Sequence, residues 1–84
     1  MLIHKFGYTF DTDAPGFKKY KVYLPNGKSV SFGDKRYQQF HDRIGFYREL
    51  DHLDLQRRAN YIRRHAKDKM DVNHAGYWSM NYLW

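Results

Sequence analysis

The large apolar side chains of this chain are mostly aromatic, and this constrains its fold more than any other feature. The 84 residues include six Phe, eight Tyr and two Trp, which together outnumber Ile, Leu and Val. Aromatic side chains bury about 150–250 Å² each, so a hydrophobic core in this chain must be filled mainly by rings. We expect five of them in the core: Phe6, Tyr20, Phe32, Tyr61 and Trp78.

The length allows one domain with little surface to hide. A domain of this size buries only about 60% of the surface that its unfolded chain exposes. We therefore expect marginal stability, with part of the aromatic surface covered by a partner protein or by self-association. The chain has no Cys, which excludes a disulfide framework and a thiolate zinc site. No apolar segment approaches the ~18 residues of a membrane span, so the sequence predicts no membrane insertion.

The clearest local pattern predicts a β-hairpin. Apolar and polar residues alternate over Lys18–Leu24 and again over Ser29–Gly33, as they do in strands with one buried face. Between the two segments lies Asn26-Gly27, the strongest short hairpin turn because both residue types accept positive φ. An isolated hairpin is unstable in water, so its apolar face must be covered.

Residues 1–17 allow two interpretations. Phe6, Tyr8 and Phe10 alternate with a period of two, which favours a third strand at the edge of the hairpin, followed by a turn at Asp13–Gly16. Alternatively, these residues form an N-terminal arm that becomes ordered only on a partner. In either case residues 18–84 are expected to form the domain itself.

A helix is predicted over Leu55–Lys67. Asp54 is a good N-cap for it, and one narrow apolar stripe runs along it: Leu55, Ala59, Ile62 and Ala66. We expect this stripe to cover the hairpin. The preceding segment, Asp34–Leu53, is less regular, and a short helix is expected only around Tyr37–Phe40.

The C-terminal segment, Ala75–Trp84, consists almost entirely of large apolar residues. A free segment of that composition would aggregate, so it should dock as a short helix or strand, on this domain or on a neighbour. These patterns together predict an α+β fold. In this small single domain a β-hairpin, extended by a third strand in one of the two interpretations of residues 1–17, packs on one main helix and is closed by the docked aromatic segment.

The charge of the chain points to anionic partners. Lys and Arg exceed Asp and Glu by six, which favours nucleic acid or acidic protein surfaces. One basic cluster lies between Arg57 and Lys69, where Asp68 is the only acid, and a second lies on the hairpin. The candidate nucleic-acid contacts are Lys18, Lys19, Lys21, Arg57, Arg64 and Lys67. The alternative is that both clusters are solvated faces or bind carboxylates of a partner protein.

Catalysis is not predicted. Candidates for metal or acid–base chemistry are present: His41, Asp42, Asp51, His52, Asp54 and His65. Their spacing matches neither HExxH nor another helical His pair, and the chain has no Gly-rich phosphate loop and no GxSxG turn. Asp54 is better explained as a helix cap, and His52 as a packed or hydrogen-bonding residue. We expect no enzyme, no metal site and no cofactor.

Three sequence blocks carry a resemblance. They are Phe32-Gly33-Asp34, then His52-x-Asp54-x-x-Arg57-Arg58-x-x-Tyr61-x-x-Arg64-His65, then Ala75-Gly76-Tyr77-Trp78-Ser79 with a closing Leu83-Trp84. Over about Lys18 to Trp84 this pattern resembles a family of small uncharacterised proteins of large double-stranded DNA viruses that infect protists and algae. The resemblance brings no established activity. It implies a viral context, in which a small basic domain is usually a virion component or a genome-associated protein.

The function expected from these features is structural. We expect a minor capsid or cementing protein that binds larger shell subunits in the virion, and that is found inside the host cell before assembly. Its partner-binding residues would be three basic ones and three exposed aromatic ones: Arg57, Arg63, Arg64, Tyr77, Trp78 and Trp84. Such residue types are enriched at interface hot spots. The alternative is a small DNA- or RNA-binding protein, for packaging or regulation, that uses the same arginine-rich helix.

Overall fold

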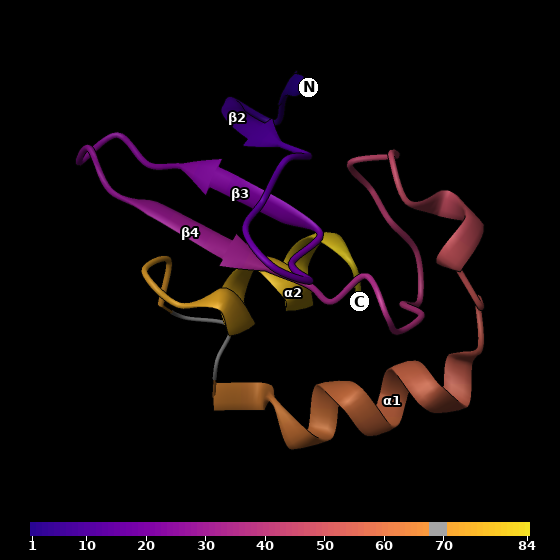
Figure 1. Ribbon diagram of the computed structural model, residues 1–84. Coiled ribbons are helices and arrows are strands. Elements are labelled where there is room, and N and C mark those ends of the chain that lie inside the picture. Colours follow the sequence, from indigo (N-terminus) through magenta and orange to yellow (C-terminus); the bar gives the residue numbers. More distant parts are fainter. Residues whose placement is uncertain (68–70) are drawn as a thin grey trace.

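The computed structural model describes residues 1–67 and 71–84. Its described residues form four strands and two α-helices (Figure 1). A short 3₁₀ helix lies in the long connection between the last strand and the first α-helix. Their bounds are β1 (Leu2–Lys5), β2 (Tyr8–Asp11), β3 (Tyr20–Tyr23), β4 (Ser29–Phe32), η1 (Arg48–Leu50), α1 (Leu55–Arg64) and α2 (Ala75–Tyr82). The expected α+β class is confirmed, and so are the hairpin and the docked C-terminal segment.

The strands form one antiparallel sheet in the order β1-β2-β3-β4. The predicted hairpin is β3–β4, with Tyr20 opposite Phe32 and Val22 opposite Val30. Gly27 has a φ of 83°, but Asn26 is not among the described residues with positive φ, so the two do not form the two-residue turn in which both φ values are positive. The Gly27 N–H donates to the Leu24 carbonyl at 3.1 Å and the Leu24 N–H donates to the Lys28 carbonyl at 2.8 Å, so the loop consists of Pro25, Asn26 and Gly27. The hairpin prediction is therefore confirmed in its position and in its buried face, whereas its loop is one residue longer than an Asn-Gly turn.

The N-terminal residues form a hairpin of their own rather than one strand from Phe6 to Phe10. Phe6 and Gly7 make the turn between β1 and β2, with φ values of 56° and 79°. Phe6 keeps the period of two by coincidence and is 50% exposed, so its prediction as a core residue is wrong. Of the two interpretations of residues 1–17, the structure has the third strand, which is β2 beside β3, and β1 adds an unpredicted fourth strand at the edge of the sheet.

The core lies between one face of the sheet and α2. Tyr20, Phe32 and Trp78 are fully buried there, as predicted. The Trp78 ring lies 6.1 Å from the rings of both Phe10 and Phe32, centroid to centroid. The core members are Phe10, Tyr20, Val22, Leu24, Val30, Phe32, Ile44, Trp78 and Leu83. The chain therefore covers its main hairpin with its own aromatic segment.

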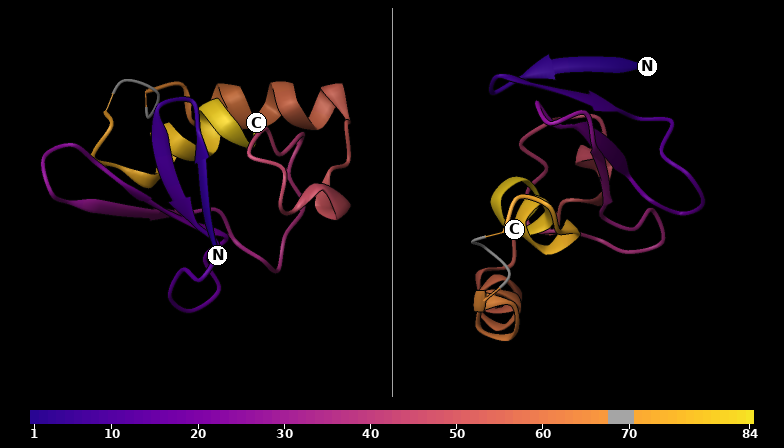
Figure 2. Two further views of the ribbon diagram at one scale, coloured as in Figure 1. Left: turned by 90° about the horizontal axis from the view of Figure 1, so that it is seen from above. Right: turned by 90° about the vertical axis from the view of Figure 1, so that its left-hand side faces the viewer.

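The prediction that α1 covers the hairpin is wrong. Asp54 caps α1 as expected, since its carboxylate accepts hydrogen bonds from the N–H groups of Gln56 and Arg57. However, no residue of α1 is buried, and Leu55, at the head of the predicted stripe, is 70% exposed. In Figure 2, right, the sheet, α2 and α1 follow one another as successive layers. Alanines of such a stripe offer little area to bury, whereas Trp78 offers a great deal.

The side of α1 that turns toward the body shares only Ile62 with the predicted stripe. Its half-buried residues are Arg58, Tyr61 and Ile62, joined by His65 immediately after the helix. The spacing i, i+3, i+4, i+7 places these four on one face. The helix ends at Arg64, and Asp68 and Lys69 of the predicted basic cluster lie outside the described residues.

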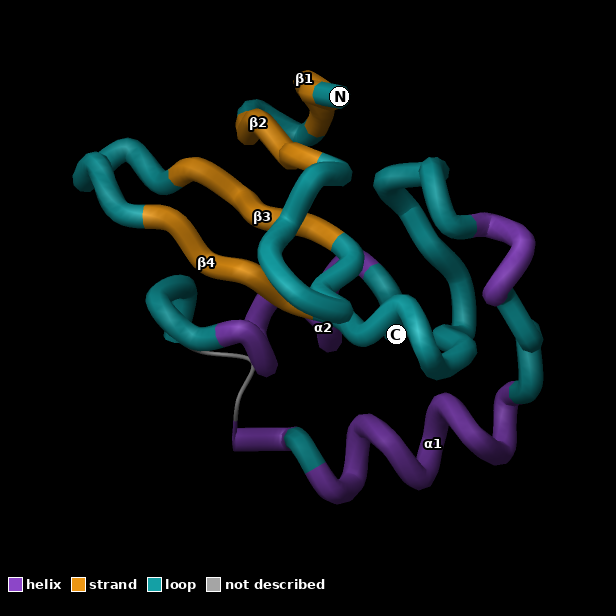
Figure 3. The backbone as a smooth tube through the Cα atoms, in the orientation of Figure 1, coloured by secondary structure: helices purple, strands orange, loops and turns teal. Residues whose placement is uncertain are grey.

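The segment between β4 and α1 is mostly loop (Figure 3). The short helix expected around Tyr37–Phe40 is absent, and Gln39 forms an isolated bridge with Asp51 instead. The Gln39 N–H donates to the Leu50 carbonyl, and the His52 N–H donates to the Gln39 carbonyl. This pairing holds the two ends of the loop together without regular secondary structure.

Candidate functional site

A buried carboxylate organises the loop from inside. Asp42 is fully buried and accepts a hydrogen bond of 2.5 Å from the Tyr20 hydroxyl. It also accepts from the N–H groups of Ile44 and Tyr47, at 2.9 and 2.8 Å. The Tyr20 oxygen in turn accepts from the Phe46 N–H at 3.1 Å. Burial, with the hydrogen bond to Asp42, raises the pKa of Tyr20, so the phenol stays protonated and donates.

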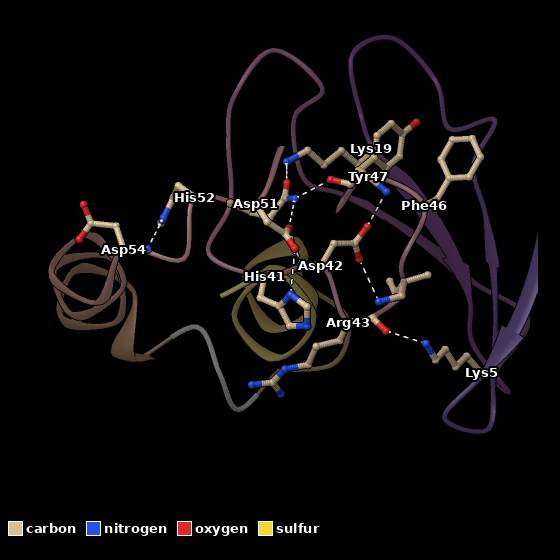
Figure 4. A network of polar contacts seen from close by, with 12 residues as sticks. Lys5, Lys19, His41, Asp42, Arg43, Phe46, Tyr47, Asp51, His52 and Asp54 are labelled. Carbon is tan, nitrogen blue, oxygen red and sulfur yellow. Dashed lines mark hydrogen bonds and ion pairs between the residues drawn. The ribbon is translucent and has the colours of Figure 1, made fainter. Parts of the chain in front are cut away.

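A second polar chain runs from the sheet into the loop (Figure 4). Lys19 donates from Nζ to Gln39 Oε1, and Gln39 Nε2 donates to Asp51 Oδ1 at 2.6 Å. Asp51 Oδ2 pairs with His41 Nδ1 at 2.8 Å. Only 1% of Lys19 is exposed, and this burial lowers the pKa of its ammonium. Lys19 is therefore an internal anchor, and its prediction as a nucleic-acid contact is wrong.

His52 packs and hydrogen-bonds, as its position before the helix suggested. Its Nδ1 accepts from the Asp54 N–H at 2.9 Å, and its ring lies 5.2 Å from that of Trp84. Its Nε2 is buried and has no hydrogen-bond partner in the part of the chain that the structure describes. Burial, with Arg57 nearby, lowers the pKa of His52, which favours the neutral ring. Within residues 1–67 and 71–84, no three His, Asp or Glu residues gather as metal ligands.

Three rings attach α1 to the body. Tyr61 stacks on Trp84 with a centroid separation of 4.2 Å and an angle of 3° between the ring planes. His65 stacks near the Tyr61 ring at 4.3 Å. Arg58 Nε donates to the Trp84 main-chain oxygen at 2.9 Å. The predicted partner residue Trp84 is thus half-buried and serves first to hold α1.

The remaining side of α1 carries the exposed Arg57, Arg63 and Arg64, and the exposed Lys67 follows three residues after the end of the helix. We call these four cations the basic face. Residues 55–67 contain no acid. The ion pairs between described residues involve the N-terminal amine, Arg36, His41 and His74, and none involves an arginine of α1. Arg57 and Arg63 bind only neutral amides, of Gln38 and Asn60 respectively, in the described part of the chain. Among the described residues, these four cations are therefore gathered without a carboxylate partner.

Two other predicted nucleic-acid contacts, Lys18 and Lys21, lie at different distances from this basic face. Lys18 is exposed and lies near it, on the loop side of α1. Lys21 alternates with the buried Tyr20 and Val22 in β3, so it projects from the face of the sheet opposite the core. The two basic clusters of the sequence therefore do not form one surface.

The predicted aromatic contacts are not the exposed ones. Trp78 is fully buried, so its prediction as a partner-binding residue is wrong. Tyr77 is half-buried. The exposed rings include Tyr37, at 64%, and Phe17, at 60%. Sequence reasoning missed Tyr37 because it placed this residue inside a short helix.

A cavity of about 390 Å³ lies beside the basic face, between the loop after β4, α1 and α2. It brings together residues from all three blocks of the sequence pattern, with Gly33 and Asp34 on one wall and Tyr61 and Trp84 on another. The full lining is Lys18, Lys19, Gly33, Asp34, Tyr37, Gln38, Tyr61, His65, Ala75, Gly76, Ser79, Leu83 and Trp84. Spacing along the sequence gave no sign that these blocks converge.

A comparison with known protein families identifies the family of this chain. The family model described as Family of unknown function (DUF5754) matches residues 15–65, more than half of the sequence. The chain belongs to this family. The DUF5754 match covers β3, β4, the loop and α1, and it leaves out the hairpin β1–β2 and α2. No curated protein and no solved structure matches the chain. None of the described helices is long and apolar enough to cross a bilayer.

Proposed function

We propose that this chain binds nucleic acid, and that the basic face of α1 makes the contact. The observation that carries the proposal is a helix with no buried residue and no acid, on which three arginines lie exposed, with the exposed Lys67 shortly after it. Cations that have no carboxylate partner remain available for phosphate groups. Arginine suits them well because its planar guanidinium forms paired hydrogen bonds with phosphate oxygens.

The neighbourhood of the basic face adds support. Arg57 reaches across to Gln38, and Arg58 lies over the Phe40 ring at 5.0 Å. These contacts hold the helix against the loop, and Arg63 and Arg64 are exposed. Cations on a folded helix bind phosphates with less loss of backbone freedom than the cations of a disordered basic tail.

The test compares two pairs of cations with equal charge. Each phosphate contact contributes about −0.7 to −0.9 to the slope of log affinity against log salt concentration. The double variant Arg63→Gln/Arg64→Gln should therefore flatten that slope by about 1.5. The control Lys21→Gln/Lys28→Gln removes the same charge from the hairpin and should leave the slope almost unchanged. Equal losses in both pairs would mean that net charge alone binds, and the assignment to α1 would fail.

A second candidate is a structural virion protein that cements shell subunits. The observation that favours it is the open edge of β1, which is hydrogen-bonded to β2 on one side only and carries the exposed Leu2. Phe6, in the turn that follows, is also half-exposed. A free edge strand with apolar side chains can pair with a strand of another protein. The sequence resemblance to viral proteins supports this context.

The two candidates differ in the surface that they need. In co-sedimentation with purified shell protein after nuclease treatment, Leu2→Lys should abolish a cementing contact, because a charge on an edge opposes strand pairing. Arg63→Gln/Arg64→Gln should leave it intact. A complex that disappears on nuclease treatment would instead support the nucleic-acid function.

A further inference from the structure

The cavity beside the basic face has no role in phosphate binding by α1 alone. Its volume of about 390 Å³ lies within the ~300–1,000 Å³ of small-molecule sites. It borders the basic face, because the Gln38 side chain that lines it accepts a hydrogen bond of 3.0 Å from Arg57. A strand that follows the basic face therefore passes the mouth of the cavity.

The charges that line the cavity favour an anionic group. Asp34 is the only carboxylate side chain among the lining residues, and Arg36 binds both of its oxygens, at 3.0 and 2.8 Å. The Arg36 guanidinium holds the pKa of Asp34 at about 2, so this carboxylate is both ionised and neutralised by its partner. Lys19 is used by Gln39. Lys18 remains as an exposed cation at the cavity.

The other lining groups suit a base. Tyr37 presents a ring that is 64% exposed, and unpaired bases stack on such rings. Gln38 and Ser79 supply an amide and a hydroxyl for the edge of a base. In a duplex the bases are stacked and paired, so a base can enter a side pocket only when it is unpaired.

We propose that this cavity binds one unpaired nucleotide, with its base on Tyr37 and its phosphate near Lys18, and that a single strand lying on the basic face supplies it. The proposal rests on the nucleic-acid function proposed above and adds a strand preference to it. A free nucleotide has the same chemistry, so the experiment must separate the two sources.

The experiment measures fluorescence anisotropy of one labelled oligonucleotide, single-stranded or annealed to its complement, with the full chain. The single strand should bind about tenfold more tightly than the duplex, and Tyr37→Ala should remove most of that difference. Tyr37→Trp keeps a ring and should retain it. Tyr23→Ala, which removes an exposed tyrosine of β3 that does not line the cavity, is the matched control and should bind like the unaltered chain.

Each other outcome has a distinct meaning. Equal affinity for single strand and duplex, unaffected by Tyr37→Ala, overturns the cavity proposal and leaves phosphate binding by α1 standing. Failure to bind either form overturns both proposals. Tighter binding of adenosine monophosphate than of the strand, in a competition experiment, overturns the strand as the source. Circular dichroism of Tyr37→Ala should match the unaltered chain, since the side chain is mostly in solvent.

Discussion

The two α-helices of this chain meet the rest of the molecule in opposite ways. α2 buries Trp78 and Ser79 and lies against β4, whereas α1 buries none of its residues. α2 carries no charged side chain, and α1 carries four arginines. The buried core contains no residue of α1, so packing in the core does not constrain the sequence of α1. This is why a helix that the domain does not need for its core can be devoted to charge.

The largest expected effect comes from truncating one large apolar residue in each helix. Trp78→Ala should lower the free energy of unfolding by about 3–5 kcal/mol, as truncations of buried aromatic residues do. Leu55→Ala should change it by less than ~0.5 kcal/mol, because this leucine is mostly in solvent. Urea titrations followed by circular dichroism measure both. Similar losses in the two variants would mean that α1 belongs to the core after all.

A smaller effect is expected where the body depends on a polar contact. Tyr20→Phe removes the hydroxyl that donates to the buried Asp42 carboxylate. Losing a hydrogen bond to a charged group should lower stability by about 1.5–3 kcal/mol. Tyr23→Phe is the matched control, since its hydroxyl lies 3.4 Å from Asp11 at the surface and should matter little. The same urea titrations apply, and equal effects would show that the buried network does not stabilise the body.

Local patterns in the sequence were enough for the parts of the fold that depend on neighbours in the chain. A turn lies at Asn26-Gly27 and the Asp54 carboxylate caps α1, as predicted, because each acts on the backbone of residues close to it in the chain. The docking of Ala75–Trp84 also followed, because a free segment so rich in large apolar residues is unstable in water.

What could not be predicted depends on competition between distant segments. The stripe of α1 and the rings of α2 were both candidates to cover the hairpin, and only packing in three dimensions decides between them. From the sequence Lys19 is expected at the surface, yet its ammonium is buried and donates a hydrogen bond to Gln39, twenty residues later. Such hydrogen-bond partners in the long loop cannot be predicted, because the loop sequence has neither a helical nor a strand period.

The sequence predicted the positive charge of the candidate site but not its cavity. Arg57, Arg64 and Lys67 were recognised as cationic, and they are exposed. The exposed ring of Tyr37 and the cavity beside it arise only when the loop, α1 and α2 converge. No spacing rule reports such convergence.

A third prediction concerns the ring stack that joins the two regions. Trp84→Ala removes the ring on which Tyr61 stacks, a contact worth about 1 kcal/mol beyond the area that it buries. Amide hydrogen exchange should become faster in residues 55–64 and change little in β2, β3 and β4. Faster exchange throughout the sheet would show that α1 and the body unfold as one unit, and the contrast between the two helices would weaken.

The smallest expected effect is a loss of folding stability at low pH. It should arise from Asp51 in the loop and not from α1. Burial alone would raise the pKa of Asp51, but hydrogen bonds from Gln39, the Asp42 N–H and His41 together lower it below the ordinary value of 3.8. In the window between the two values, the unfolded chain holds a proton on Asp51 that the folded chain does not. The contribution of Asp51 is therefore present above pH 3.8 and is lost as the pH falls through its folded pKa.

Asp51→Asn cannot titrate at this position, so its urea midpoint should fall less than that of the unaltered chain between about pH 6 and about pH 3. The variant should also be less stable at the higher pH, because the amide replaces an oxygen that accepts from His41 or Gln39. The diagnostic quantity is therefore the change of the midpoint with pH and not its value at one pH. An equal fall in both proteins would locate the acid sensitivity in other carboxylates, such as Asp34, whose pKa is held at about 2 by Arg36.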